Sequence, residues 1–149
     1  MKKILFILVA FASFLVSCDI ETSDNGNLDG YWHIVAVDTL ANSAHTDMSN
    51  QKVYWAFQKN LLQLRGSTDT EKALQEFYLR FSLDKDMLTL SDIHLRDREK
   101  DDPLVDESTM PLIYIYGINQ MRESFQVLKL NGHEMVLQNE TIRISFVKM

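Results

Sequence analysis

Apolar and polar residues alternate with a period of two along much of this chain, and this alternation limits what it can fold into. In the segment 77–83, FYLRFSL, every odd-numbered residue is apolar, with tyrosine, arginine and serine between them. The same pattern recurs at 31–38, 53–58 and 141–148. Successive side chains of a strand point to opposite faces, so the alternation predicts strands with one buried and one solvent-facing side. Such strands are typical of antiparallel sheets.

Further strands are predicted where short apolar runs stand between turn signals. These runs lie at 60–65, 87–95, 125–130 and 134–138. The last two flank Asn131-Gly132, a favoured two-residue hairpin turn because both of its central positions need positive φ. The chain is therefore predicted to be all-β, a meander of about eight short antiparallel strands that forms a sandwich or a barrel.

Three segments depart from the strand pattern. The segments 69–76 and 117–123 are predicted to form short helical turns, since Ile118 and Met121 in the second share one helical face. The segment 96–111 is charged, contains both prolines of the chain and has no period. We expect it to be an irregular excursion on the surface.

The N-terminal segment has the composition of a targeting signal. Lys2 and Lys3 precede an uncharged apolar run at 4–15. A run of this length cannot cross a bilayer as a helix, which takes about 20 residues. The segment is therefore predicted to be a secretory signal peptide and is left out of the fold.

Cys18 is the only cysteine of the 149 residues, and it ends the segment 15–18, LVSC. A leucine three residues before a cysteine, with a small residue directly before it, resembles the lipobox of bacterial lipoproteins. The resemblance implies that 1–17 is a cleaved signal peptide and that Cys18 carries the lipid. The polar, acidic composition of 18–29 predicts a flexible tether. The segment 30–149 then forms one domain.

The charge of the chain after this cleavage excludes some partners. Removing Lys2 and Lys3 leaves 13 basic residues against 21 acidic residues, a net charge near −8. Nucleic acid needs a basic patch for its phosphates, so it is not expected as a partner. Anionic lipid head groups are not expected to hold the domain either. We expect contact with the membrane through the lipid alone.

Several short motifs resemble one superfamily. The segment 30–32, GYW, resembles the G-x-W start of the first barrel strand of lipocalins, whose tryptophan closes one end of the barrel. With Cys18 and the polar tether, the segments 116–118, YGI, and 146–148, FVK, resemble short lipocalin-like lipoproteins of Gram-negative bacteria. The resemblance implies a small up-and-down β-barrel of about eight strands with one or two short helical turns. It also implies that an arginine from the last strand, Arg143, crosses Trp32 as a barrel-closing pair.

Large aromatic side chains on the apolar strand faces are the candidate ligand site. They are Trp32, Trp55, Phe57, Phe77, Phe81 and Phe146. Two interpretations stay open: a packed core, or an apolar pocket for a small lipid-like or aromatic molecule. The chain is short and lacks the disulfide and the long C-terminal helix of full-length lipocalins, which favours a barrel filled with its own side chains.

No motif indicates catalysis. The chain has no G-x-S-x-G, H-E-x-x-H, P-loop or C-x-x-C pattern. Its four histidines are scattered without an H-x-H pair, and the acidic run within 96–111 lacks the glycine of a calcium loop. We therefore expect no enzyme activity, no metal and no cofactor.

The sequence thus predicts a membrane-anchored envelope lipoprotein that binds a small apolar ligand inside a lipocalin-like barrel. The alternative is an accessory protein-interaction module of an envelope complex, with a filled core and the 96–111 loop as its contact. We expect the outer membrane as its location, facing either the periplasm or the surface. Asp19 directly follows Cys18. In some bacteria an aspartate there retains a lipoprotein in the inner membrane, so that alternative stays open.

Overall fold

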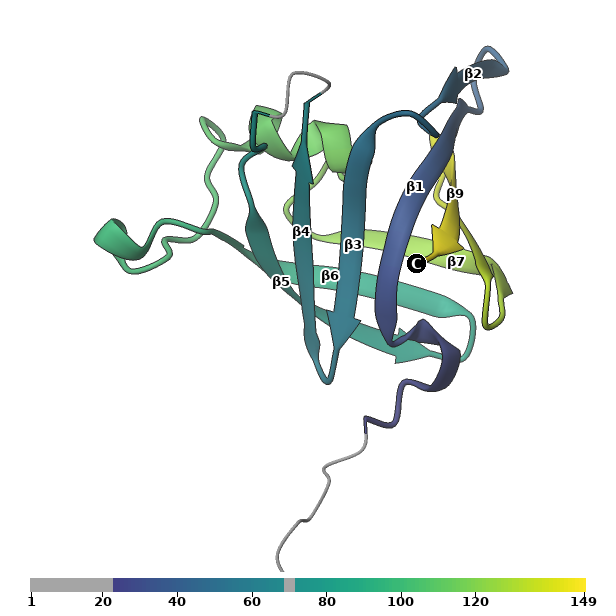
Figure 1. The fold of residues 1–149 in the computed structure, drawn as a ribbon, viewed down its shortest axis with the longest axis horizontal. Helices are drawn as coiled ribbons and strands as arrows, with labels where there is room; N and C mark the ends of the chain where they lie inside the picture. The colour runs from purple at the N-terminus through teal and green to yellow at the C-terminus, as the bar shows by residue number, and fades with distance from the viewer. Residues whose placement is uncertain (1–22, 69–71) are drawn as a thin grey trace, which may run out of the picture.

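The computed structural model describes residues 23–68 and 72–149, and within these ranges there are nine antiparallel strands, eight of which form one closed barrel (Figure 1). The strands are β1 (Gly30–Thr39), β2 (Ala44–Asp47), β3 (Lys52–Gln58), β4 (Leu61–Ser67), β5 (Phe77–Asp84), β6 (Met87–Leu95), β7 (Glu123–Leu130), β8 (Glu134–Gln138) and β9 (Ile142–Lys148). Predictions for 1–22, including the signal peptide and Cys18, lie outside the described residues. No helix in the described ranges is long and apolar enough to cross a membrane.

The strands follow one another around the barrel in the order of an up-and-down meander. From β3 to β9 each strand pairs with the next, and β1 closes the ring by pairing with both β3 and β9. The strand β2 is additional: it pairs only with β1 and forms an arm at the rim. The other eight strands were predicted. The strand β2 was not, because its sequence AHTD has no apolar face and all four residues are exposed.

Alternation decides which side chains enter the barrel. In β3 the burial alternates residue by residue, with Val53, Trp55 and Phe57 inside. Among the odd-numbered residues of 77–83, Phe77, Leu79 and Phe81 are buried as the pattern predicted, and Leu83 is half-buried against the core. Burial of these apolar faces, each side chain contributing about 1.5–3 kcal/mol, is what drives the sheet to close.

A short 3-10 helix, η4 (Met110–Tyr116), covers one end of the barrel (Figure 1). Ile113 and Tyr116 face inward and are fully buried. The phenol of Tyr116 donates to the carbonyl oxygen of Gln75 at 2.8 Å. The indole nitrogen of Trp55 donates to the carbonyl oxygen of Tyr116 at 3.0 Å, which fastens this helix to the barrel wall.

The predicted helical turns are corrected by this structure. The segment 117–123 is not helical; the helix precedes it, and Gly117 ends it with a φ of 79°. Met121, assigned to the helical face, is instead exposed. Residues 72–76 are not helical, and 69–71 lie outside the described residues. The spacing of apolar residues at 118, 121 and 125 reflected a bend leading into β7 rather than a helix.

The end of the predicted tether belongs to the fold. Residues Gly26–Leu28 form a 3-10 turn, η2, in which Leu28 is fully buried. The indole nitrogen of Trp32 donates to the Leu28 carbonyl oxygen at 2.8 Å. The amide of Asn25 donates to the Lys59 carbonyl oxygen. The tether prediction is therefore wrong for residues 25–29, because Leu28 is the one apolar side chain there and it fills this end of the barrel.

The charged segment 96–111 is more regular than predicted. The N–H of Leu95 donates to the Pro103 carbonyl oxygen at 2.9 Å, and the N–H of Val105 donates to the Ile93 carbonyl oxygen at 2.8 Å. Residues 93–105 thus form a hairpin that extends β6 and projects from the barrel, with a 3-10 turn, η3 (Arg98–Lys100), near its tip (Figure 1).

Gly117 is predicted to be essential for joining η4 to the barrel. A Cβ there would lie 2.5 Å from the Ile144 Cδ1 atom, in a backbone conformation of positive φ. We expect Gly117→Ala to lower the free energy of unfolding by about 1–3 kcal/mol in urea denaturation. Gly132→Ala is the control, since a Cβ there would meet nothing within 4 Å. Equal stability of the two variants would contradict the role of this close contact.

Candidate functional site

The six aromatic residues predicted as a ligand pocket all lie inside the barrel. They are Trp32, Trp55, Phe57, Phe77, Phe81 and Phe146, and between 0 and 9% of each is accessible to solvent. Trp32, Trp55 and Phe77 have no accessible surface at all. Such a side chain touches no space large enough to admit a water molecule, so no ligand cavity borders it.

Contacts among these rings explain why the interior is closed. The Trp55 ring centroid lies 5.1 Å from that of Phe146, 6.0 Å from Phe57 and 6.1 Å from Phe125. Phe57 meets Phe81 at 5.0 Å with perpendicular planes. Edge-to-face pairs at these distances are favourable and leave little room between the rings. The aromatic cluster is therefore a packed core in this structure and not an apolar pocket.

The prediction that Arg143 pairs with Trp32 to close the barrel is wrong, because another residue supplies the cation. Lys148, and not Arg143, lies over Trp32, with its Nζ atom 5.0 Å from the ring centroid. Residues 144, 146 and 148 share one face of β9, and Trp32 is in register with Lys148. Arg143 has the opposite parity, so it is exposed on the outer face and its Nε donates to the Gln138 Oε1 atom at 2.9 Å.

The glycine of the GYW motif leaves space for the side chain of this lysine. A Cβ at Gly30 would lie 2.6 Å from the Cε atom of Lys148, and the φ of Gly30 is 122°. Lys148 can therefore pass the backbone and donate from Nζ to the Asn27 carbonyl oxygen at 3.0 Å. The motif at 30–32 and the one at 146–148 form one end-closing unit with η2.

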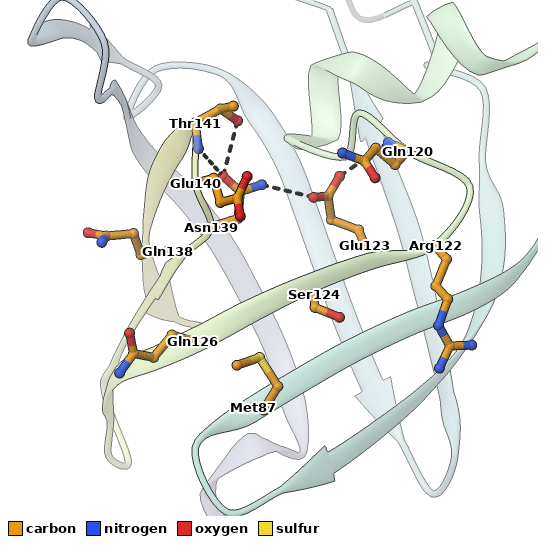
Figure 2. Close-up of a pocket in the computed structure, with 10 residues that line it drawn as sticks. All are labelled: Met87, Gln120, Arg122, Glu123, Ser124, Gln126, Gln138, Asn139, Glu140 and Thr141. Carbon is orange, nitrogen blue, oxygen red and sulfur yellow. Dashed lines mark hydrogen bonds between the residues drawn. The ribbon is translucent and has the colours of Figure 1, made fainter.

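An open cleft of about 560 Å³ lies on the outer side of the barrel wall (Figure 2). It is named here the seam cleft, and it is lined by Met87, Gln120, Arg122, Glu123, Ser124, Gln126, Gln138, Asn139, Glu140 and Thr141. Ser124 and Gln126 are exposed, whereas Phe125 between them is buried. The cleft is therefore separated from the aromatic core by the strand β7 itself.

The seam cleft exists because β7 and β8 diverge. The two strands pair from Gln126 and Gln138 to Leu130 and Met135. Beyond Gln138 the chain turns through 139–141 into β9, while β7 still has three residues on the other side, 123–125. A wedge opens between β7 and this turn, and the side chains of both elements line it.

Glu123 closes the bottom of this wedge. It is the only buried charged or polar residue in the parts of the chain that the structure describes. Its Oε2 atom accepts the N–H groups of Asn119 and Gln120 at 3.0 and 3.1 Å, and its Oε1 atom accepts the amide of Asn139 at 2.9 Å. Figure 2 shows the carboxylate between Gln120 and Asn139. Three donors offset its desolvation, and they hold the two banks of the cleft together.

The Asn139 turn is itself rigid. Its Oδ1 atom accepts the N–H groups of Thr141 and Ile142 at 2.9 and 2.8 Å. Its amide nitrogen is used by Glu123, so the whole side chain is committed to structure. The groups left to meet a ligand are therefore those on the walls of the cleft, above this network.

The wall groups suit polar recognition. Three glutamines line the cleft, and a carboxamide both donates and accepts hydrogen bonds. The Oγ atom of Ser124 lies 3.2 Å from the Oγ1 atom of Thr89. Arg122 and Glu140 carry opposite charges, and Met87 supplies one apolar contact, being 46% exposed. The cleft can thus bind a molecule with several neighbouring donors and acceptors and no concentrated charge.

No pattern in the sequence predicted this site. Its residues come from the start of β6, the segment before β7, β7 itself and the β8–β9 turn, and none stands in a motif. Glu123 was not singled out, because nothing in the local sequence distinguishes a buried glutamate from an exposed one. No group of three or more His, Cys, Asp or Glu suited to a metal occurs within residues 23–68 and 72–149.

The geometry defines a lipocalin-like barrel with a solid interior and an external cleft. A family model, the lipocalin-like domain, matches residues 13–149, and the chain belongs to this lipocalin-like family. A search among curated proteins finds no match.

Solved structures share the fold. One is a lipocalin-like protein from Bacteroides uniformis, with a TM-score of 0.62 and 18% identity over 83% of this chain and all of the other. A second is an uncharacterized protein from Bacteroides eggerthii, with a TM-score of 0.61 and 15% identity over 81% of this chain and 98% of the other. Together with the family match, these likenesses confirm the predicted lipocalin-like barrel.

Removing the charge of Glu123 tests whether it holds the cleft. In Glu123→Gln an N–H₂ group replaces one of the two carboxylate oxygens, which together accept from three donors. We expect the free energy of unfolding to fall by about 1–3 kcal/mol in urea denaturation. Glu140→Gln is the control, because Glu140 lines the same cleft but is exposed. A Glu123 variant as stable as the control would show that these hydrogen bonds do not secure the wedge.

Proposed function

We propose that this protein is a lipid-anchored lipoprotein of the cell envelope whose barrel binds a small polar ligand in the seam cleft. The observation that carries the ligand assignment is the contrast between the two sites. The aromatic interior includes rings without accessible surface, whereas the cleft is open and measures about 560 Å³. Pockets for small molecules typically measure about 300–1,000 Å³.

The sequence supports the anchor. Cys18 is the only cysteine and follows a short apolar run with a leucine three residues earlier. A lone thiol in an oxidising compartment has no partner within the chain for a disulfide, which favours Cys18 as a site of lipid attachment. The described chain enters the barrel at the end opposite η4 (Figure 1). That end would face the membrane, and the seam cleft would open on the side wall. We place the protein at the outer membrane.

The lining supports a neutral ligand with several hydroxyl groups, such as a sugar. The amides of Gln120 and Gln126 can each match one donor and one acceptor of such a molecule, and vicinal hydroxyl groups offer both, whereas the Gln138 Oε1 atom already accepts from Arg143. Arg122 is the one basic residue of the lining and Glu123 and Glu140 are the two acidic ones, a formal net charge of −1, which disfavours an anionic ligand. A lipid chain would find only Met87 as an apolar partner among the ten lining residues.

The same lining supports binding rather than catalysis. The carboxylate of Glu123 is already engaged by three N–H donors, so its oxygens are committed to holding the cleft together. The hydroxyl of Ser124 has a threonine hydroxyl beside it, and no histidine lines the cleft to act as a base. A nucleophile needs such a base within hydrogen-bond reach.

A second role, as a protein-interaction module, is favoured by two observations. The interior of the barrel is filled, so its outer surface must supply any contact. The 93–105 hairpin and the β2 arm both project from the barrel (Figure 1). This role does not compete with the seam cleft for residues, since neither projection lines it.

The anchor is tested by replacing its attachment atom. We expect the full chain expressed in a Gram-negative host to fractionate with membranes and to show the mass of an acylated, cleaved protein. In Cys18→Ala both properties should be lost, because the sulfur that carries the lipid is missing. Ser17→Ala, which keeps a small residue before the cysteine, is the control. A Cys18→Ala variant that stays with the membrane fraction would contradict the proposal.

The ligand is tested by titrating the full chain with a panel of neutral mono- and disaccharides. Binding is measured by isothermal titration calorimetry and by NMR. We expect saturable binding by at least one sugar, weakened about fivefold in Gln126→Leu through loss of one hydrogen bond. Gln58→Leu, an exposed glutamine outside the cleft, should bind as the unmodified chain does. The sugar assignment fails if no member of the panel perturbs the cleft. It also fails if Gln58→Leu weakens binding equally.

A further inference from the structure

The arm formed by β1 and β2 leaves one sheet edge without a partner. In the described residues β2 pairs with β1 alone. The N–H of Met48 donates to the Val35 carbonyl oxygen at 2.9 Å. This hydrogen bond fixes which residues of β2 direct their backbone N–H and C=O groups toward β1. Because hydrogen-bonding directions alternate along an antiparallel strand, the backbone N–H and C=O groups of Thr46 also point toward β1. The N–H and C=O groups of His45 and Asp47 face the open edge.

The two faces of this arm differ in chemistry. The register pairs Val37 with Thr46 on one face, and Asp38 with His45 on the other. The Nδ1 atom of His45 lies 2.6 Å from the Oδ1 atom of Asp38. Asp47, in register with Ala36, shares the face of Asp38. A strand added beside β2 would therefore meet one acidic face and one face that looks into the barrel end.

A groove of about 240 Å³ lies on that second face. It runs between the arm and η4, and its side chains are mainly apolar: Val37, Met48, Tyr114, Ile115 and Ile142, with Thr46 at the edge of β2. Leu112, Tyr114 and Ile115 are 50%, 49% and 37% exposed on this one short helix. Large apolar side chains gathered on a surface typically mark a contact with another molecule.

The N-terminal segment of the chain cannot cover this groove. This step rests on the proposed cleavage before Cys18, which leaves the five residues 18–22 ahead of the described chain. Five extended residues span at most about 17 Å. The described chain starts at the end of the barrel opposite η4 (Figure 1). The strand β1 alone, with ten residues, is about 33 Å long.

Charge narrows the choice of partner. Arg143 is in register with Asp38 from the β9 side, so Asp47 is the carboxylate left for an added strand. Hydrogen bonds from Ser49 lower the pKa of the Asp47 carboxyl below its ordinary value. The strand β2 carries no lysine or arginine. A basic side chain would complement this face, and an acidic one would be repelled.

We propose that the free edge of β2 binds an extended segment of a second protein in which aliphatic and basic residues alternate. The backbone of this segment pairs with His45 and Asp47, its aliphatic side chains enter the groove beside Tyr114 and Ile115, and its basic side chains face Asp47. Addition of a strand to an exposed sheet edge obtains affinity from the main chain and specificity from pockets for alternate side chains. This surface is distinct from the seam cleft and defines the partner of the protein-interaction role.

The test uses the full chain and a labelled short peptide in which valine and lysine alternate, measured by fluorescence anisotropy. We expect binding that weakens about tenfold in the double variant Tyr114→Ser, Ile115→Ser, since two apolar contacts are lost. Leu128→Ser is the matched control, because Leu128 is 45% exposed on β7, outside the groove. Asp47→Asn should weaken binding several-fold at low salt and keep the Ser49 turn. Thermal unfolding followed by circular dichroism verifies that each variant is folded.

Two peptide controls separate edge pairing from charge. A peptide of the same composition with its valines and lysines in two blocks, and one N-methylated at alternate residues, should both lose binding. Equal binding of the blocked peptide, or an unchanged affinity of the groove variant, would overturn the proposal. So would a dimer of the chain in analytical ultracentrifugation that disappears in the groove variant, because a second copy would then cover this edge. Sugar titration of the same variants reports separately on the seam cleft.

Discussion

Burial of Trp55 inside the barrel is the interaction on which the rest of the structure depends. Its ring contacts Phe57, Phe125 and Phe146, which come from three strands. Its indole N–H reaches the Tyr116 carbonyl oxygen and holds the helix that covers one end. One side chain therefore connects the wall, the core and the cap. Aromatic burial of this extent stabilises a small barrel that has no disulfide.

Filling the barrel in this way moves any binding to the outside. A closed sheet has one inner face, and large aromatic residues occupy it. Binding surfaces must then arise where the meander is imperfect. The seam cleft forms where β8 ends and leaves the first three residues of β7 without a partner on that side, and the β2 edge forms where the chain adds a hairpin that the ring does not need. Both irregularities carry polar or exposed residues for the same reason: neither faces the core.

How far the sequence predicted this outcome depends on the range of each interaction. Alternation placed Phe77, Phe81 and Phe146 inside the barrel, because side-chain direction in a strand is a local property. The same parity excluded Arg143 from the interior, and applying it to β9 would have pointed to Lys148 as the cation over Trp32. The turn at 117–123 was misjudged because apolar spacing over a few residues fits a helix and a bend equally well. Glu123 carried no local signal, since its partners Asn119, Gln120 and Asn139 meet only in the fold.

The sequence by itself determined the all-β class, the eight strands of the ring and the lipocalin-like resemblance, whereas lipid attachment at Cys18 stays a prediction. These follow from composition, period and short motifs, which act within a few residues. Only the tertiary structure decided that the aromatic cluster is a solid core, that residues 25–29 close one end, and that a polar cleft and a free edge lie on the outside. Those properties depend on how distant side chains share one volume, and no local pattern encodes the space that remains between them.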